Sequence, residues 1–148
     1  MRALVISGGG SKGAFAGGVA QYLMQEKKHQ YDLLLGTSTG SLLIPHLALG
    51  NIDKIYDIYT NVNMEKIFSI NPFVIKNKNE VDIVTINHFN VIKQFLKGKR
   101  TFGESQHLKK YIRENFSLSE FNQLKSSNCN IVITVTNLSK NEAEYKCI

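Results

Sequence analysis

Ser38 lies at the centre of the pentapeptide Gly36-Thr37-Ser38-Thr39-Gly40, a G-x-S-x-G pattern that follows a short apolar run. The glycines leave room for a sharp turn from strand to helix, which holds the central serine with its hydroxyl exposed. A hydroxyl at the N-terminus of a helix is suited to nucleophilic attack, because the helix dipole favours developing negative charge. The same serine could instead cap the helix, a structural role that the pentapeptide alone does not exclude.

A second glycine cluster, Gly8-Gly9-Gly10-Ser11-Lys12-Gly13, follows the first apolar run of the chain. Three of its glycines fit G-x-G-x-x-G, the fingerprint of a dinucleotide-binding loop. That function requires an acidic residue at the far end of the next strand. The nearby acid, Asp32, stands at the beginning of that strand instead. The cluster is therefore better explained as a set of backbone amides that bind an oxyanion.

The elements that must position these two loops are strands and helices in alternation. The pattern predicts a buried strand over residues 2–7 and a helix that starts at Gly13 and ends in the polar stretch QEKKHQ. A second strand is predicted over residues 31–36. A helix over residues 38–50 follows it, and Pro45 predicts a kink there because it lacks a backbone donor.

Parallel strands joined by a crossover helix end at the same edge of a sheet. If the first two strands are parallel, the amides of Gly9, Gly10 and Ser11 would face the carbonyl group that Ser38 attacks. One donor of such an oxyanion hole lowers the reaction barrier by about 3 kcal/mol.

The remainder of the chain is predicted to be mostly helical, with a β-hairpin over residues 130–148. The asparagine- and lysine-rich residues 71–84 are expected to be a loop with some extended structure. The further helices are expected over residues 51–62, 87–99, 104–116 and 118–125. This order of elements is typical of α/β proteins.

The net charge of +6 has two explanations, a solvated lysine-rich surface or attraction to an anionic partner. A phospholipid surface fits better than nucleic acid, because aromatic residues are not interleaved with the basic ones. The longest apolar stretch, SLLIPHLALG, is far short of the roughly 20 residues that span a bilayer. Cys129 and Cys147 are expected to be reduced thiols on strands. We expect a cytoplasmic protein, or one peripheral to a membrane, and no nucleic-acid partner.

GGGSKG after a single strand, followed by GTSTG after the next, resembles the patatin-like phospholipases. The resemblance covers the chain in outline and is specific over residues 1–50. It implies a three-layer α/β/α fold with a mainly parallel central sheet, of which residues 1–148 would be the N-terminal part of a single domain. It also implies a lipid acyl hydrolase with a Ser–Asp dyad and with neither metal nor cofactor. Ser38 matches the family's nucleophile, Gly8 to Gly13 match its oxyanion loop, and the neighbours of Ser38 match its nucleophile elbow.

The sequence departs from the family pattern at Lys12, where arginine is usual, and at Thr39, where a small alanine is commoner. The family's aspartate, in Asp-Gly-Gly or Asp-Gly-Ala, is missing, since no Asp-Gly occurs and the last aspartate is Asp82. We therefore expect the dyad aspartate beyond residue 148. Other candidates for the base have no motif around them: Asp32, Asp53, Asp57, Asp82, His29, His46, His88 and His107. Of these, His88 and His107 could complete an ordinary triad, whereas His46 is expected to be a packed core residue.

Two other functions remain open from the sequence. One is a catalytically inactive patatin-like scaffold or regulatory domain, because a serine without a base is a poor nucleophile. The other is a nucleotide-binding module that uses Gly8, Gly10 and Gly13 for phosphate, which leaves GTSTG unexplained.

Overall fold

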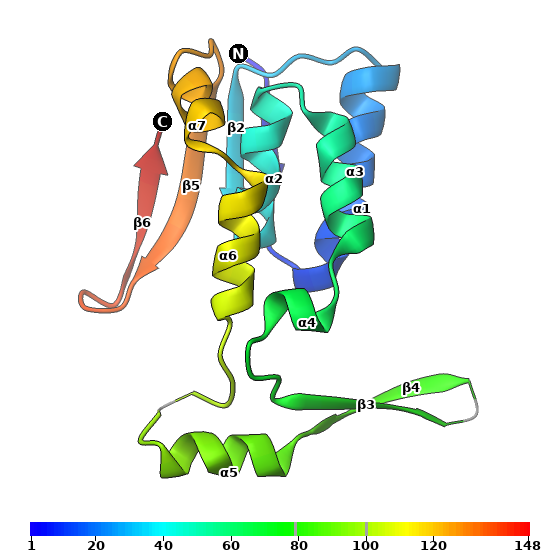
Figure 1. The fold of residues 1–148 in the computed structure, drawn as a ribbon. Helices are drawn as coiled ribbons and strands as arrows, with labels where there is room; N and C mark the ends of the chain where they lie inside the picture. Colours follow the sequence, from blue (N-terminus) through cyan, green and yellow to red (C-terminus); the bar gives the residue numbers. More distant parts are fainter. Residues whose placement is uncertain (79, 100) are drawn as a thin grey trace. The chain divides into compact units, whose positions relative to one another are not determined.

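The computed structural model describes residues 1–78, 80–99 and 101–148 and divides the chain into two compact units (Figure 1). Unit 1 consists of residues 1–61 and 117–148, and unit 2 consists of residues 62–116. The two glycine-rich loops and both termini belong to unit 1.

The centre of unit 1 is a four-stranded sheet in the order β1-β2-β5-β6. Its strands are β1 (Ala3–Ile6), β2 (Leu33–Thr37), β5 (Asn130–Asn137) and β6 (Glu142–Cys147). Strand β2 is parallel to both β1 and β5, and β6 pairs with β5 in the antiparallel direction. The expected α/β fold with a mostly parallel sheet is therefore confirmed, as is the hairpin at the end of the chain.

The helices of unit 1 follow the predicted pattern closely. They are α1 (Gly13–Gln21), continued by a π-helical turn over Tyr22–Glu26, α2 (Thr39–Ala48), α3 (Ile52–Asn61) and α7 (Leu118–Lys125). Helix α2 continues through Pro45. In Figure 1, α1, α2 and α3 lie side by side, and α2 contacts both β2 and β5.

The core of unit 1 lies between this helical layer and one face of the sheet. Leu34 and Ile131 are neighbours on that face through the β2–β5 register, and both are fully buried with Leu43, Ile44 and Leu47 of α2. Val5 pairs with Leu35, one position along from Leu34, and therefore points to the other face of the sheet, where it is 64% exposed. The sheet of unit 1 is thus well covered on the helical side.

Helix α7 begins with a capping box, in which Ser117 Oγ accepts from the Glu120 amide and the Glu120 carboxylate accepts from the Ser117 amide. The same carboxylate accepts from Lys54 of α3 over 2.6 Å. The hydrogen bond from Lys54 is the main reason why the pKa of Glu120 falls from 4.5 to about 2. This ion pair joins α3 to α7 inside unit 1.

The described residues of unit 2 form a hairpin and three helices. They are α4 (Met64–Ile67), β3 (Phe73–Lys78), β4 (Val81–Ile86), α5 (His88–Leu96) and α6 (Gln106–Asn115). The expectation of a loop with some extended structure over residues 71–84 is right about the extended structure and wrong about the loop, because β3 and β4 pair from Phe73↔Ile86 to Lys78↔Val81. Asn79, within that predicted loop, lies outside the described residues. The short helix α4 was not predicted, and it packs against α6.

Cys147 lies on β6 as expected, but Cys129 immediately precedes β5 and is not on a strand. Both cysteines are free thiols. Among the described residues, none of the helices is long and apolar enough to cross a membrane.

Candidate active site

The register of the first two strands brings the two glycine-rich loops to the same edge of the sheet. Strands β1 and β2 are parallel, with Ile6 opposite Gly36. The chain leaves β1 into the loop of Gly8–Gly10 and leaves β2 into the turn at Ser38. The parallel arrangement on which the predicted site depends is therefore present.

Ser38 occupies a strained turn between β2 and α2. Its φ of 55° and ψ of −121° place a residue with a side chain in a backbone region that normally favours glycine. Ser38 is the N-cap residue of α2, yet its side chain makes no capping hydrogen bond. The alternative explanation, a serine retained as a helix cap, therefore finds no support in the geometry. The side chain is exposed, so its hydroxyl is accessible.

The turn requires glycine on both sides of Ser38. A Cβ atom on Gly36 would lie 2.6 Å from the carbonyl carbon of Gly40. A Cβ atom on Gly40 would lie 2.1 Å from the carbonyl oxygen of Ile6, so α2 begins in direct contact with β1. Ser41 closes the turn, because its hydroxyl donates to the Gly36 carbonyl over 2.9 Å and its amide donates to the Ser38 carbonyl over 2.9 Å.

Gly8 is the point at which the first loop meets Ser38. A Cβ atom there would lie 2.7 Å from Ser38 Cβ and 3.3 Å from Ser38 Oγ. The absent side chain is what allows the backbone of this loop to approach the serine hydroxyl. The structure thus places Ser38 and Gly8, which are 30 residues apart in the sequence, in direct contact.

The backbone amides of the first loop fall into two groups. The Lys12 amide donates to the Gly9 carbonyl over 3.1 Å, and the Gly13 amide donates to the carbonyls of Gly10 and Ser11. Within the described residues, the amides of Gly9, Gly10 and Ser11 make no such bond, as is usual where a helix begins. Gly10 has a φ of +56°, a backbone conformation that favours glycine over residues with a side chain.

The candidate bases of unit 1 lie elsewhere. Asp32 precedes β2 and accepts a hydrogen bond from the Arg2 amide, so it is at the opposite end of β2 from Ser38. Asp53 is in the first turn of α3, where it accepts from Gln25 over 3.5 Å. Asp57 is exposed on the same helix, and His29 lies in the segment before β2.

His46 is buried in the last turn of α2, eight residues and about 12 Å along the helix from Ser38. Burial, with a contribution from Lys54, lowers its pKa. The expectation of a packed core histidine is confirmed. Asp82, His88 and His107 belong to unit 2, where Asp82 accepts from Asn77 and His107 Nδ1 donates to the Glu65 carbonyl. Among the described residues, no carboxylate or imidazole is hydrogen-bonded to Ser38 Oγ.

Tyr59 of α3 was not identified from the sequence, although it lies against the first loop. A Cβ atom on Gly13 would be 2.7 Å from the Tyr59 hydroxyl and 3.1 Å from Thr39 Cβ. Burial raises the pKa of Tyr59, so its hydroxyl stays protonated at neutral pH. In the described part of the chain, neither this hydroxyl nor Thr39 Oγ1 has a hydrogen-bond partner. No sequence signal distinguishes Tyr59 from Tyr56, the other tyrosine of α3.

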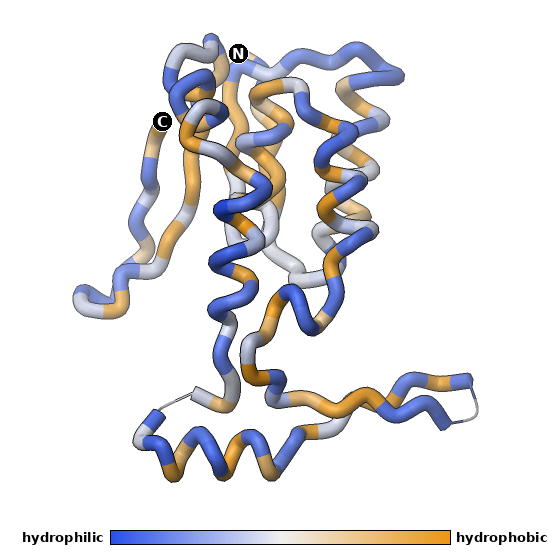
Figure 2. Tube along the Cα trace, in the orientation of Figure 1, coloured by the Kyte–Doolittle hydropathy of each residue, from blue (hydrophilic) through white to orange (hydrophobic). Residues whose placement is uncertain are grey.

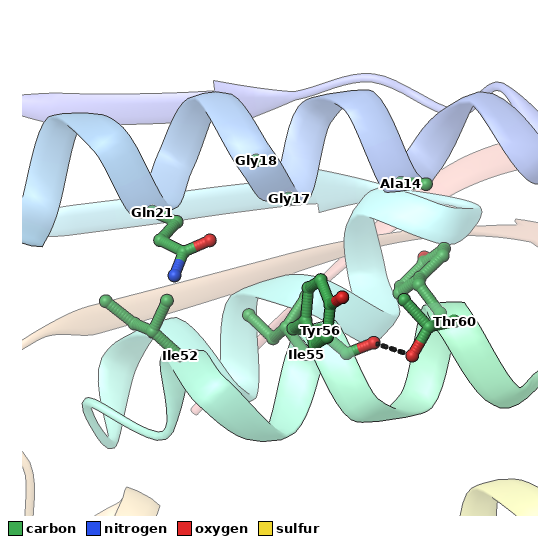
Figure 3. Close-up of a pocket in the computed structure, with 9 residues that line it drawn as sticks. Ala14, Gly17, Gly18, Gln21, Ile52, Ile55, Tyr56 and Thr60 are labelled. Atoms are coloured by element: carbon green, nitrogen blue, oxygen red, sulfur yellow. Dashed lines mark hydrogen bonds between the residues drawn. The ribbon is translucent and has the colours of Figure 1, made fainter.

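An apolar cavity of about 200 Å³ lies between α1 and α3, on the helical side of unit 1 (Figure 3). Gly17 and Gly18 of α1 form one wall, and Ile52, Ile55 and Tyr56 of α3 form the other. The cavity extends to Ala14 and Tyr59, next to Gly13, and so reaches the residues that support the first loop.

Thr37, the residue before Ser38, joins the turn to the neighbouring strand. Its hydroxyl donates to Thr134 Oγ1 of β5 over 3.2 Å. With Ser38 between β2 and α2, the fold defines a class: an α/β protein with a strained serine turn at the carboxyl edge of a mostly parallel sheet.

The comparison with protein families identifies that class more closely. The family model of patatin-like phospholipases matches residues 4–145, nearly the whole chain, and the chain therefore belongs to the patatin-like phospholipase family. Membership indicates a function like that of lipid acyl hydrolases. Neither a comparison with curated proteins nor one with solved structures gave a significant match.

Proposed function

We propose that this protein is a serine lipid acyl hydrolase, a phospholipase or esterase, in which Ser38 is the nucleophile. The observation that carries the proposal is the strained backbone of Ser38, whose exposed hydroxyl is not used to cap α2. Strain of this kind, in a turn that packing holds in place, is typical of functional residues. Family membership supplies the substrate class, acyl esters of lipids.

In the proposed reaction, Ser38 Oγ attacks the ester carbonyl and forms a tetrahedral intermediate with a negatively charged oxygen. The amides of Gly9, Gly10 and Ser11 are proposed to hold this oxygen, because they are the loop amides with no internal partner among the described residues. Lys12 and Gly13 shape the loop through their own amide bonds, and Gly8 gives the loop access to Ser38. The remaining elbow residues, Gly36, Thr37, Thr39 and Gly40, hold the turn.

The general base is proposed to be an aspartate outside these 148 residues. Support for this comes from the positions of the candidates in unit 1, where Asp32 and Asp53 are engaged with Arg2 and Gln25. The base would take the Ser38 proton during attack and return it to the leaving alcohol. Water would then hydrolyse the acyl-enzyme by the reverse sequence of proton transfers.

The test is hydrolysis of a chromogenic fatty acyl ester and of phosphatidylcholine by the protein and by its Ser38→Ala variant. We expect the variant to lose about 1,000-fold or more of kcat, because the covalent route is removed. Ser119→Ala is the matched control, since Ser119 is an exposed serine of α7 away from the turn. A Ser38→Ala variant with normal turnover would contradict the mechanism.

One observation favours a second candidate, a catalytically inactive scaffold or regulatory domain. Among the described residues, no side chain that could act as a base is bonded to Ser38 Oγ. The same assay separates the two functions, because a scaffold would hydrolyse neither ester above the rate of the Ser38→Ala variant. A nucleotide-binding role has no comparable support, since Asp32 is bonded to Arg2 at the wrong end of β2.

A further inference from the structure

Helix α5 of unit 2 exposes its apolar side chains and buries a polar one. Phe89 and Leu96 are 75% and 84% exposed, and Ile92 and Phe95 are also exposed on the same side of the helix. Gln94 is only 1% exposed, and in the described residues its side-chain amide has no hydrogen-bond partner. In water this orientation is unfavourable on both counts, because apolar surface stays wet and a polar group is buried unpaired.

The orientation of α5 is fixed by hydrogen bonds at its start. Asn87 caps the helix by accepting from the Asn90 amide over 3.1 Å, and its own amide donates to the Pro72 carbonyl over 2.7 Å. The Asn90 side chain donates to the Asn71 carbonyl over 2.9 Å. These bonds hold the polar side of α5 against the segment that leads into β3. The apolar side is therefore held outward by the fold of unit 2.

Phe102 extends the exposed side of α5, because its ring packs edge-on against that of Phe95 with centroids 6.0 Å apart. We call Phe89, Ile92, Phe95, Leu96 and Phe102 the α5 surface. Figure 2 shows apolar residues alternating with polar ones along α5 and a strongly apolar stretch along β3. The hairpin adds a similar face, since Ile75 lies opposite Val84 and both are exposed.

The charge along α5 and the residues that follow it is mostly positive, although Lys99 is paired with Glu104 over 3.4 Å. From residue 88 to residue 100 the sequence contains four basic residues and no acidic residue. Lys93 and Lys97 are exposed, and among the described residues neither forms an ion pair. A second copy of this chain would bring the same positive charges face to face and be repelled. An anionic partner with an apolar interior would attract the lysines and bury the phenylalanines.

We propose that the α5 surface docks this protein onto anionic phospholipid membranes, with α5 lying in the plane of the interface. Basic amphipathic helices with phenylalanine and leucine on one face bind membranes in this manner. The lysines would face the negative lipid headgroups, an attraction that extends over about a Debye length. The proposal extends the proposed lipid hydrolysis, because it names the surface from which the substrate would be taken.

The test uses the Ser38→Ala variant as background, so that binding is measured without hydrolysis and the two proposals can fail separately. Sedimentation with vesicles measures the partition coefficient on phosphatidylcholine alone and on phosphatidylcholine mixed with phosphatidylserine. Leu96→Glu and Leu138→Glu are the matched pair, because Leu96 and Leu138 are 84% and 87% exposed and the second lies in the β5–β6 turn. Neither substitution touches the core, so both variants are expected to fold.

We expect Leu96→Glu to lower partition onto the anionic vesicles about tenfold or more, since it removes a leucine that the bilayer would bury and adds a repelled charge. Leu138→Glu should change it by less than about twofold, and binding should weaken as salt rises above about 0.1 M. Equal binding by the two variants would overturn the proposal, as would equal binding to neutral vesicles at all salt concentrations. A third outcome would assign the α5 surface to a second copy of the chain instead. In that case the protein does not bind vesicles, its molecular mass in solution rises with protein concentration, and the Leu96→Glu variant keeps the mass of a monomer.

Discussion

Helix α2 in unit 1 buries Leu43, Ile44 and Leu47 almost completely, whereas helix α5 in unit 2 turns Phe89 and Leu96 toward solvent. Both helices are about ten residues long, and both carry apolar and polar side chains. The difference lies in what each helix packs against. Helix α2 packs on β2 and β5, so that the turn at Ser38 is supported from behind.

This contrast separates two requirements of the proposed lipid hydrolysis. A nucleophile in a strained turn needs close packing, because strain persists only where the surroundings hold it. A membrane-binding surface needs exposed apolar side chains that are held in a fixed orientation. Unit 1 has the first property and unit 2 has the second. Each property can be tested by a substitution that should lower stability, activity or membrane binding, compared with a control substitution that should not.

The largest effect on stability is expected from Gly40→Ala. The added methyl group would lie 2.1 Å from the Ile6 carbonyl oxygen, so α2 must move away from β1, at a cost of about 3 kcal/mol or more. Urea unfolding followed by circular dichroism measures the loss. Gly18→Ala is the control, because this exposed glycine of α1 has no atom within 4 Å of the new Cβ and the change should stabilise by about 0.5–1 kcal/mol. Equal stability of the two variants would contradict the close contact of α2 with β1.

The next effect is expected on catalysis, from Gly8→Ala. Its methyl group would lie 2.7 Å from Ser38 Cβ, so either the serine or the loop must shift. A shift of about 1 Å at the reacting group lowers kcat by about 100-fold. Ester hydrolysis is measured together with the urea midpoint, which should change little because Gly8 is exposed. Full activity in a folded Gly8→Ala variant would show that the loop does not act on Ser38.

A smaller effect is expected from the ion pair between α3 and α7. Lys54 and the cap of α7 hold the pKa of Glu120 at about 2, below its ordinary value of 4.5. This pair therefore stabilises the fold fully above pH 4.5 and loses its contribution as the pH falls from 4.5 to about 2. Glu120→Gln should lower stability by about 1 kcal/mol at neutral pH and remove that part of the acid dependence.

The measurement is urea unfolding over a series of pH values, with Glu114→Gln as the control. Glu114 is paired with Lys110 over 3.7 Å on the exposed side of α6, where ion pairs contribute about 0–1 kcal/mol. An unchanged acid dependence in Glu120→Gln would mean that another group is responsible. If Glu114→Gln also lowered stability strongly, the ion pairs of the two units would not differ in their contribution to stability.

Much of unit 1 was predictable from its sequence, because the signals there are local. Glycine-rich stretches mark the ends of β1 and β2, and the apolar spacing of residues 13–23 and 41–49 indicates helices that cover a sheet. The hairpin of residues 130–148 follows from two β-rich runs around a polar turn. The family resemblance rests on the same local motifs, and the family comparison confirms it.

Unit 2 was less predictable, for a physical reason that the hairpin illustrates. In the sequence of residues 73–86, FVIKNKNEVDIVTI, a polar run separates two apolar-rich runs, and the pairing of Ile75 with Val84 involves no motif. Exposed two-stranded pairs lack the buried face that makes a strand recognisable. Helix α5 was predicted, but the direction in which its apolar residues face was not, and the bonds of Asn87 and Asn90 explain why that face is turned outward.

The sequence by itself determined the identity of the serine turn, the glycine loop and the order of strands and helices in unit 1, because each depends on neighbouring residues. The tertiary structure decided the rest. It brought Gly8 to Ser38 through the parallel register of β1 and β2, engaged the amides of Lys12 and Gly13, and placed Tyr59 beside Gly13. These are contacts between residues far apart in the chain, which form only when the core fixes how strands and helices pack.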